Sequence, residues 1–209
     1  MDETNSLNRA AKIISVIFHP LFMPLYGLIL LMFSIPAVYN YFLFSINKIL
    51  LLIILINNTV LPLSLLVFLK MKNQISSREV ESRKERMLLL FFATILYAIT
   101  SYIVIKYPVP NFIKTYFIGI FFVASSITVI NNWWKISIYA AGAGMLTALM
   151  LMLSLQMYHV MILPLMAIII AAGLILSSRL RLNSHTPAQA WIGFLLGFIE
   201  LCILYKMII

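Results

Sequence analysis

A polar run at residues 177–187 interrupts a chain that is 63% hydrophobic, and it groups the side chains best suited to chemistry. Arg179, Arg181 and His185 lie within it. Cationic side chains beside a membrane segment are costly unless they hold something anionic, and the planar guanidinium group matches the oxygen atoms of a phosphate. The run therefore predicts an anion site, at which the anion is either only bound or also cut.

The end of this run has the residues of a helix N-terminus. Thr186 suits the N-cap, Pro187 the first helical position and Gln189 the third position after the cap, as in a capping box. His185 precedes the cap, so we expect its imidazole near the free backbone N–H groups at the start of the last apolar segment. The plainer alternative is an interfacial loop with snorkelling arginines.

Two earlier loops carry most of the remaining polar side chains. Residues 76–86 mix basic and acidic side chains, most of which suit a solvated, salt-bridged turn. Arg86 is the exception, because it directly precedes an apolar segment. The loop at residues 131–135 contains two tryptophans typical of the headgroup level and ends at Lys135. These side chains are expected to lie near the membrane surface.

Seven apolar segments of about 18 residues or more predict membrane-spanning helices. Continuous apolar runs favour helices over barrel strands, which alternate. The small residues at 140–144, with Gly193 and Gly197, predict close helix packing. The sequence therefore predicts an all-α, polytopic membrane helical bundle of six or seven helices, with residues 1–209 as a single integral membrane domain. The predicted spans are residues 13–35, 47–69, 87–106, 112–130, 136–154, 160–177 and 190–208.

Seven spans place the N-terminus and the loops after the second, fourth and sixth spans on one side of the membrane. Eleven of the 15 Lys and Arg residues lie on that side, which the positive-inside rule would make cytoplasmic. Bundle helices bring alternate loops to one face, so we expect a basic pocket there. The first apolar run is long and lacks a clear cleavage site, so we expect a retained span, not a signal peptide.

Other chemistries lack their sequence signatures. The chain has one cysteine, no His-x-x-x-His pair and no glycine-rich phosphate loop, so neither a metal site nor a nucleotide cofactor is expected. The net charge of +9 suits anionic lipid headgroups better than nucleic acid. Asn57 and Asn58 are expected to hydrogen-bond between helices, whereas His19 and Glu200 have no assigned role.

The polar run resembles the signature of the type 2 phosphatidic acid phosphatase superfamily, Ser-Arg-x5-His-x3-Asp. Ser178, Arg179 and His185 fall on this pattern, and Gln189 stands at the position of the aspartate. The resemblance covers about residues 70–200.

The two other motifs of that family are matched in part. In Lys-x6-Arg-Pro, Arg86 takes the arginine position and Arg78 lies one residue out of register from the lysine. In Pro-Ser-Gly-His, Ser137 matches the serine and Tyr139 stands at the histidine.

The resemblance implies a mechanism and a set of site residues. His185 would attack phosphorus, Arg86 and Arg179 would clamp its oxygen atoms, and Gln189 and Tyr139 take the positions of the orienting and proton-donating groups. Further phosphate-binding candidates are Arg181, Ser137, Lys135 and Arg78. No cofactor is implied.

The resemblance implies a lipid-phosphate or polyprenyl-diphosphate phosphatase, with membrane lipids or polyprenyl phosphates as its partners. We expect a multi-pass protein of the cell (inner) membrane. The resemblance implies a site that faces away from the cytoplasm, whereas the distribution of Lys and Arg places the same loops on the cytoplasmic side. One alternative is an inactive relative that binds lipid phosphate headgroups or acts as a subunit of a membrane complex. The sequence also leaves open whether the chain forms a homo-oligomer. A small transporter is a third reading, based on proline-interrupted spans and intramembrane polar residues.

Overall fold

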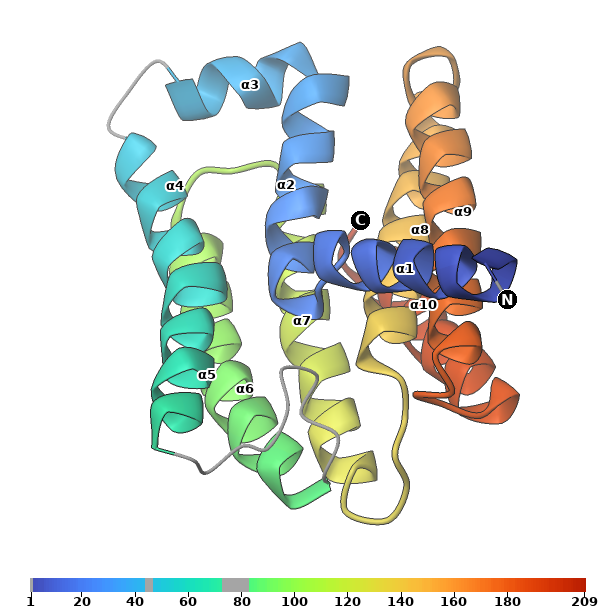
Figure 1. Ribbon diagram of the computed structural model, residues 1–209. Helices are drawn as coiled ribbons and strands as arrows, with labels where there is room; N and C mark the ends of the chain where they lie inside the picture. The colour runs from blue at the N-terminus through green and yellow to red at the C-terminus, as the bar shows by residue number, and fades with distance from the viewer. Residues whose placement is uncertain (1, 44–46, 73–82) are drawn as a thin grey trace.

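The computed structural model describes residues 2–43, 47–72 and 83–209. Within these ranges every regular element is helical, which confirms the predicted all-α class. Two short elements are not α-helical: η1 is a 3-10 turn and η2 is a π-helical turn. The elements labelled in Figure 1, with the two turns between them, are α1 (Asp2–Ile17), η1 (Pro20–Phe22), α2 (Met23–Ser34), α3 (Pro36–Leu43), α4 (Lys48–Leu55), η2 (Ile56–Val60), α5 (Leu61–Met71), α6 (Arg83–Lys106), α7 (Asn111–Ile130), α8 (Ile138–Gln156), α9 (Tyr158–Arg181) and α10 (Pro187–Ile208).

Seven helical stretches of the described chain are long and apolar enough to cross a membrane, as predicted. A helix closes its backbone hydrogen bonds within its own turns, so apolar sequences of this length satisfy both backbone and side chains in hydrocarbon. Two of the stretches are interrupted, the first by η1 and the second by η2. The chain is therefore a polytopic helical membrane bundle. The seven stretches are residues 5–34, 48–71, 86–106, 111–130, 138–156, 162–181 and 187–208.

The central helix α8 packs most closely against α10, and glycines allow this approach. A Cβ atom on Gly197 would lie 2.0 Å from the carbonyl oxygen of Ala141, and one on Gly144 would lie 2.0 Å from a carbonyl oxygen of α10. Gly193 faces the carbonyl oxygen of Ser137 in the same way. The prediction that these small residues serve helix packing is confirmed. The contact also fixes the relative positions of the loops that precede the two helices.

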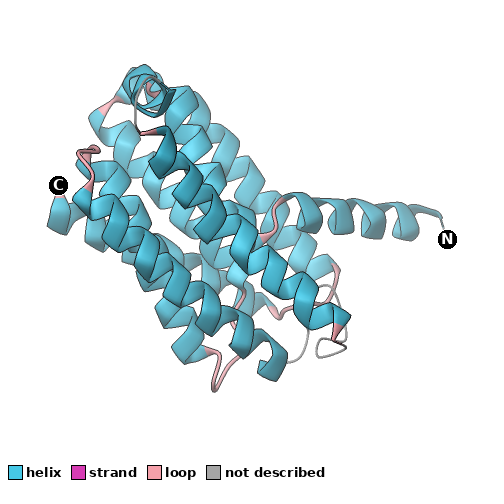
Figure 2. Ribbon diagram, turned by 90° about the vertical axis from the view of Figure 1, so that its left-hand side faces the viewer, coloured by secondary structure: helices cyan, strands magenta, loops and turns pink. Residues whose placement is uncertain are grey.

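The first predicted span, residues 13–35, is bent rather than straight. α1 ends at Ile17, and the chain turns through η1 into α2. Figure 1 shows α1 lying across α9, and Figure 2 shows its N-terminal end projecting from the bundle. Proline accounts for the break, because Pro20 lacks an N–H and disfavours helical geometry in the residue before it. That residue, His19, is extended, with φ −62° and ψ 137°.

The start of α2 is anchored to α7 just beyond this turn. The hydroxyl of Tyr116 donates to the carbonyl oxygen of Met23 at 2.8 Å. The same side chain is fully buried against Gly27, where a Cβ atom would lie 2.1 Å from the hydroxyl oxygen. This contact holds η1, and with it His19, at a fixed position beside α7.

The second span is unwound locally at η2, where its two asparagines stand. π-helical turns are rare and recur at functional sites. Asn58 is buried, yet neither of its side-chain polar atoms has a hydrogen-bond partner among the described residues. Thr59 instead donates to the carbonyl oxygen of Leu21 at 3.4 Å, which ties η2 to η1. The interhelical hydrogen bond expected from Asn58 is therefore not found in the described part of the chain.

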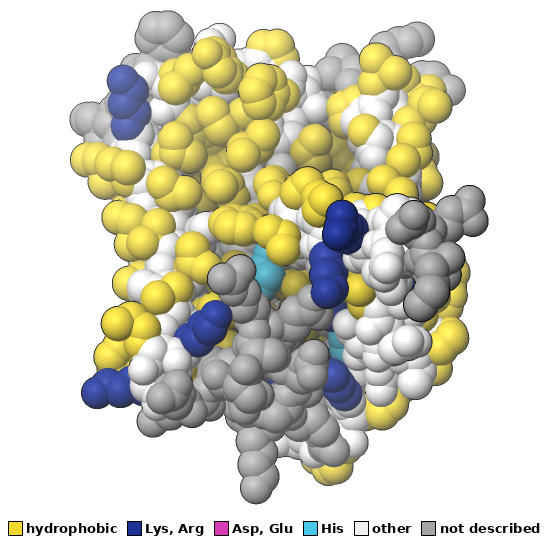
Figure 3. Space-filling model, viewed as in Figure 1, with side chains coloured by type: hydrophobic (Ala, Val, Ile, Leu, Met, Phe, Trp, Pro, Cys, Tyr) yellow, Lys and Arg dark blue, Asp and Glu magenta, His cyan; other side chains and the backbone are white. Residues whose placement is uncertain are grey.

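The polar loops gather at one end of the bundle, as the topology predicts. Figure 1 shows the connections at residues 131–137 and 182–186 near the end of the bundle at which α6 begins. The backbone N–H of Ser137 donates to the carbonyl oxygen of Gln189 at 3.2 Å and joins the two connections. On the face shown in Figure 3, basic and histidine side chains lie mostly in this half, whereas the other half is mostly hydrophobic. This face of the bundle is thus chemically divided along its length.

Candidate functional site

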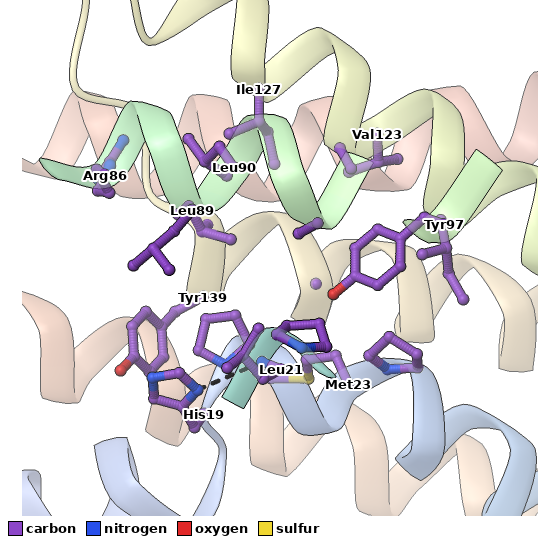
Figure 4. A pocket seen from close by; sticks show the side chains of 18 of the residues that line it. His19, Leu21, Met23, Arg86, Leu89, Leu90, Tyr97, Val123, Ile127 and Tyr139 are labelled. Carbon is purple, nitrogen blue, oxygen red and sulfur yellow. Dashed lines mark hydrogen bonds between the residues drawn. The ribbon is translucent and has the colours of Figure 1, made fainter. Parts of the chain in front are cut away.

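A cavity of about 140 Å³ lies among η1, α2, α5, α6, α7, α8 and the end of α9, and it has two chemically different ends. Figure 4 shows Arg86, Tyr139 and His19 at one end and Val123 and Tyr97 toward the other. No acidic residue is present among the described residues that line it. At one end the polar lining residues are His19, Arg86, Lys135, Tyr139, Arg179, Ser184 and His185. The other end is mostly apolar and includes Met23, Leu90, Ala93, Ile120, Val123 and Met145, together with the hydroxyl of Tyr97.

The C-terminus of α9 brings His185 to the cavity. The helix ends at Arg181, and Asn183 takes the left-handed conformation with φ 51°. An asparagine tolerates this conformation better than most residues, and it is typical of the position just after a helix. The N–H of Ser184 then donates to the carbonyl oxygen of Arg179 at 3.2 Å, which turns the chain back toward the helix end. His185 is consequently placed beside Arg179 and is 8% exposed.

A capping box at the start of α10 fixes the tautomer of His185. The N–H of Gln189 donates to the hydroxyl oxygen of Thr186 at 3.3 Å, and Oε1 of Gln189 accepts the N–H of Thr186 at 3.1 Å. Because the backbone N–H is a donor, the atom facing it must be the amide oxygen. The same oxygen lies 3.2 Å from Nδ1 of His185, so Nδ1 carries the proton and donates it. In the neutral ring, Nε2 therefore has a free electron pair.

His185 is held in its neutral form. The pKa of His185 is lowered from 6.5 to about 4, chiefly by burial and next by the positive charge of Arg179. The hydrogen bond with Gln189 opposes this shift, whereas Arg86 and Lys135 add to it. At neutral pH the imidazole is therefore unprotonated at Nε2 and lies in a cationic surrounding, a state that suits a nucleophile facing an anion.

Arg179 is packed into the site rather than extended into solvent, and it is 3% exposed. Its guanidinium carbon lies 4.2 Å from the centroid of the Tyr139 ring, a cation–π arrangement. Nη1 donates to the hydroxyl of Ser15 in α1 at 3.1 Å. The bent N-terminal helix thus helps to position an arginine that lies 164 residues later in the chain.

Arg86 reaches the cavity from the first turns of α6 and is 5% exposed. Its Nη2 donates to the side-chain oxygen of Asn131 and to the carbonyl oxygen of Ile136 at 3.0 Å. Both acceptors belong to the loop before α8, and both are uncharged. Lys135 of the same loop is half-buried and lines the cavity with Arg86. One loop and the ends of two helices therefore bring three cationic groups together.

The structure assembles five of the nine predicted site residues at the cavity wall: Arg86, Lys135, Tyr139, Arg179 and His185. Gln189 lies behind His185, where it contacts the ring without being among the described lining residues.

Three predicted phosphate ligands are not brought to this wall. Ser137 is fully buried and caps α8 by accepting the N–H of Ala140, and it is not among the described residues that line the cavity. Arg181 is exposed and donates to the side-chain oxygen of Asn8 at 3.0 Å, which places it on the outer side of α9 and away from the cavity. Arg78 lies outside the described residues.

Sequence reasoning missed His19, which lines the cavity from the turn between α1 and α2. The His-Pro pair inside an apolar segment was its available signal, because a proline there predicts a break that exposes the preceding residue. Ser15 and Asn131, which hold the two arginines, carried no signal at all. Glu200 of α10 hydrogen-bonds to Ser126 of α7 and is not among the described lining residues.

The cavity is suited to an amphiphilic anion, with cationic groups and a neutral histidine at one end and mostly apolar side chains at the other. Among the described residues, no three His, Cys, Asp or Glu side chains lie close enough to hold a metal ion. No protein-family model, curated protein or solved structure matches the chain.

Proposed function

We propose that the chain is an integral membrane phosphatase for lipid phosphates or polyprenyl diphosphates, with its site in the cell (inner) membrane. The observation that carries this proposal is the division of one cavity into a cationic end that contains His185 and an apolar end within the bundle. A lipid phosphate has the same two parts, joined by an ester oxygen. The likeness of the Ser178–Gln189 segment to type 2 phosphatidic acid phosphatases supports the same class.

Charge complementarity supports a phosphate as the polar ligand. Arg86, Lys135 and Arg179 line the polar end, and no acidic side chain stands among the described lining residues. Buried guanidinium groups bind phosphate oxygens in a fork geometry and stabilise the charge that spreads over them during transfer.

His185 supplies a nucleophile for this transfer. Its Nε2 electron pair bonds to phosphorus, the bond from phosphorus to the lipid oxygen breaks, and that oxygen keeps the bonding electrons. Water then attacks phosphorus, and the N–P bond breaks with its electrons returning to Nε2. The released phosphate keeps the water-derived oxygen with one proton, and the second proton of the water goes to the lipid oxygen that left. The Nδ1–H donated to Gln189 keeps the ring in the required tautomer throughout.

The two altered family positions favour a diphosphate as the substrate. Gln189 offers a neutral amide in place of a carboxylate, and the Tyr139 ring is engaged by Arg179. Assistance to the nucleophile and to the leaving group is therefore reduced. A leaving lipid monophosphate needs less protonation than a leaving alcohol, so cleavage between the two phosphates places the smallest demand on this site.

The second candidate is a relative that binds lipid phosphate headgroups without cutting them, alone or as a membrane subunit of a larger complex. The same neutral Gln189 is the observation that favours it, because an amide stabilises the imidazolium formed during catalysis less than a carboxylate does. Its cationic cavity would serve recognition only.

Phosphate release from a panel of lipid monophosphates and diphosphates, with the purified protein in detergent micelles, tests the proposal. We expect the natural protein to release phosphate and His185→Ala to release it only at the background rate. The melting temperature of the variant should equal that of the natural protein. Release that survives His185→Ala would end the assignment of the nucleophile. No release from any lipid, combined with headgroup binding that weakens in Arg179→Ala, would instead establish the binding-only alternative.

A further inference from the structure

Tyr97 of α6 places a hydroxyl group in the part of the cavity that is otherwise mostly apolar. Its side chain is only 8% exposed. The backbone carbonyl oxygen of Tyr97 accepts the hydroxyl of Ser101 at 2.8 Å, whereas its own hydroxyl has no hydrogen-bond partner in the described part of the chain. Figure 4 shows this hydroxyl directed into the cavity, toward the side on which Met23 lies. Buried tyrosine hydroxyls usually find a partner, so this residue is an exception.

The side chains that share this end of the cavity offer the hydroxyl no strong acceptor. They are hydrocarbon or thioether groups, among them those of Met23, Ala93 and Val123. Tyr116 of α7 is also buried, but its hydroxyl donates to the carbonyl oxygen of Met23 at 2.8 Å. An unpaired donor in such surroundings is costly. The acceptor for Tyr97 can come from the molecule that occupies the cavity.

The hydroxyl of Tyr97 lies far from the cationic end of the cavity. Arg86 and Tyr97 belong to the same helix, α6, and their separation in sequence corresponds to about 16 Å along the helix axis at a rise of about 1.5 Å per residue. The ring leans toward the Arg86 end, as long helical side chains do, so its hydroxyl is somewhat closer than that. An oxygen atom that meets this hydroxyl therefore belongs to the chain of a lipid phosphate and not to its phosphate group.

We propose that Tyr97 makes the cavity selective for lipid phosphates whose chain carries an acceptor oxygen, in an ester, ether or hydroxyl group, over purely hydrocarbon polyprenyl chains. This inference rests on the proposed binding of a lipid phosphate, and it holds whether the phosphate is cut or only bound. A prenyl chain covers the hydroxyl with hydrocarbon and leaves a buried donor unpaired, which weakens binding. A chain with an oxygen at the matching position accepts the hydrogen bond and avoids that loss.

Tyr97→Phe tests the hydroxyl alone, because the phenyl ring keeps the packing of the side chain. Its melting temperature without ligand should equal or exceed that of the natural protein, since the substitution removes an unpaired donor and no hydrogen bond within the described chain. Tyr102→Phe is the matched control on the same helix. Tyr102 is 64% exposed and is not among the described residues that line the cavity.

The probes are long-chain alkylphosphonic acids, either with a plain chain or with one methylene group replaced by an ether oxygen at each chain position in turn. Their P–C bond replaces the ester that a phosphatase cuts, so isothermal titration in micelles measures binding without turnover. We expect one ether position to favour binding to the natural protein, relative to the plain chain. In Tyr97→Phe that preference should fall roughly 5- to 150-fold, and the plain chain should bind more tightly than it does to the natural protein.

The role of Tyr97 would be overturned if the natural protein and Tyr97→Phe had the same relative affinities for plain and ether chains at every position. The same fall in preference in Tyr102→Phe would also overturn it. Either result leaves the binding of a lipid phosphate intact. A natural protein that binds no phosphonate and releases phosphate from no lipid would overturn the proposed function and the role of Tyr97 with it. Binding of the plain phosphonate to the natural protein therefore distinguishes the two failures.

Discussion

Nδ1 of His185 lies 3.2 Å from Oε1 of Gln189, and the same oxygen accepts the N–H of Thr186 at 3.1 Å. One amide oxygen thus completes a helix cap and orients the candidate nucleophile. A glutamine in this position satisfies the capping box as well as an acidic residue does, but it brings no charge to the imidazole. Local helix chemistry and site chemistry are coupled through a single side chain.

Substitutions of Gln189 separate its role in the helix cap from its role in orienting His185. Gln189→Glu keeps both acceptor contacts and adds a negative charge, so the pKa of His185 should rise above 4. A charge-assisted hydrogen bond is worth roughly 1 kcal/mol more than a neutral one, which corresponds to roughly fivefold faster phosphate release. Gln189→Leu should lose both contacts and release phosphate more slowly than the natural protein.

Thr186→Ala is the matched control for these variants. It removes the other half of the capping box at a cost of about 1 kcal/mol but leaves the contact between Gln189 and His185. We expect it to lower the melting temperature with little change in phosphate release. Loss of release as large as that in Gln189→Leu would show that the cap alone, and not the orientation of His185, controls the rate.

The protonation of His185 is directly measurable. The chain has three histidines, so NMR of the ¹³C-labelled rings, with His185→Asn to assign the signal, gives the pKa of His185. We expect a midpoint near 4, well below the ordinary 6.5. Inorganic phosphate should move the midpoint upward, because a bound anion offsets the charges of Arg179 and Arg86. A midpoint near 6.5 without phosphate would contradict the burial of this ring.

The same shift predicts how stability depends on pH. The folded pKa of about 4 lies below the unfolded value of 6.5, so the unfolded chain binds more protons between these values. The contribution of His185 to stability is therefore complete above pH 6.5 and is lost as the pH falls toward 4. His185→Asn should flatten the melting temperature in this window relative to the natural protein.

The ring of Tyr139 is expected to matter more than its hydroxyl. Tyr139→Phe keeps the surface on which Arg179 rests, so lipid phosphate binding should change less than about threefold. Tyr139→Leu removes a desolvated cation–π contact worth about 2 kcal/mol, which predicts roughly 30-fold weaker binding. Binding can be measured by isothermal titration in micelles. A large loss of turnover in Tyr139→Phe would instead identify the hydroxyl as the proton donor.

The glycines of the α8–α10 contact predict a stability difference. A Cβ atom on Gly197 would meet backbone at 2.0 Å, so Gly197→Ala should destabilise the protein by about 1–3 kcal/mol. Gly173 has no atom within 4 Å of its Cβ position, and Gly173→Ala should be neutral or gain up to about 1 kcal/mol from helix propensity. Melting temperatures of the two variants in the same detergent test the pair. Equal behaviour would mean that the helices do not pack this closely.

The features that follow from local sequence were predictable. Each span is a continuous apolar run, and hydrocarbon leaves a helix as the only way to satisfy its backbone. The box formed by Thr186 and Gln189 depends on residues three apart, so its residue types identify it without knowledge of the fold. The cationic end of the cavity was predictable from alternate loops meeting at one face, which brought Arg86, Lys135 and Arg179 together.

The features that depend on distant contacts were not predictable. Ser137 has the residue type of a phosphate ligand, but the packing of α8 against α10 buries it in a cap. Arg181 follows Arg179 by two residues and so points to a different side of α9, toward Asn8. His19 reaches the site only because the first span bends, and the angle of that bend depends on contacts with α7 and α9.

The two sides of the cavity differ in how far they are able to adapt. The wall on α8 is backed by α10, which meets α8 backbone to backbone at Gly144, Gly193 and Gly197, so this wall has little room for displacement. The opposite wall is made of the proline-broken start of α2 and the span that contains η2, whose helices are interrupted. For the proposed lipid phosphate, substitutions on that second wall should therefore change which hydrocarbon chain is accepted and leave the geometry around the phosphate unchanged.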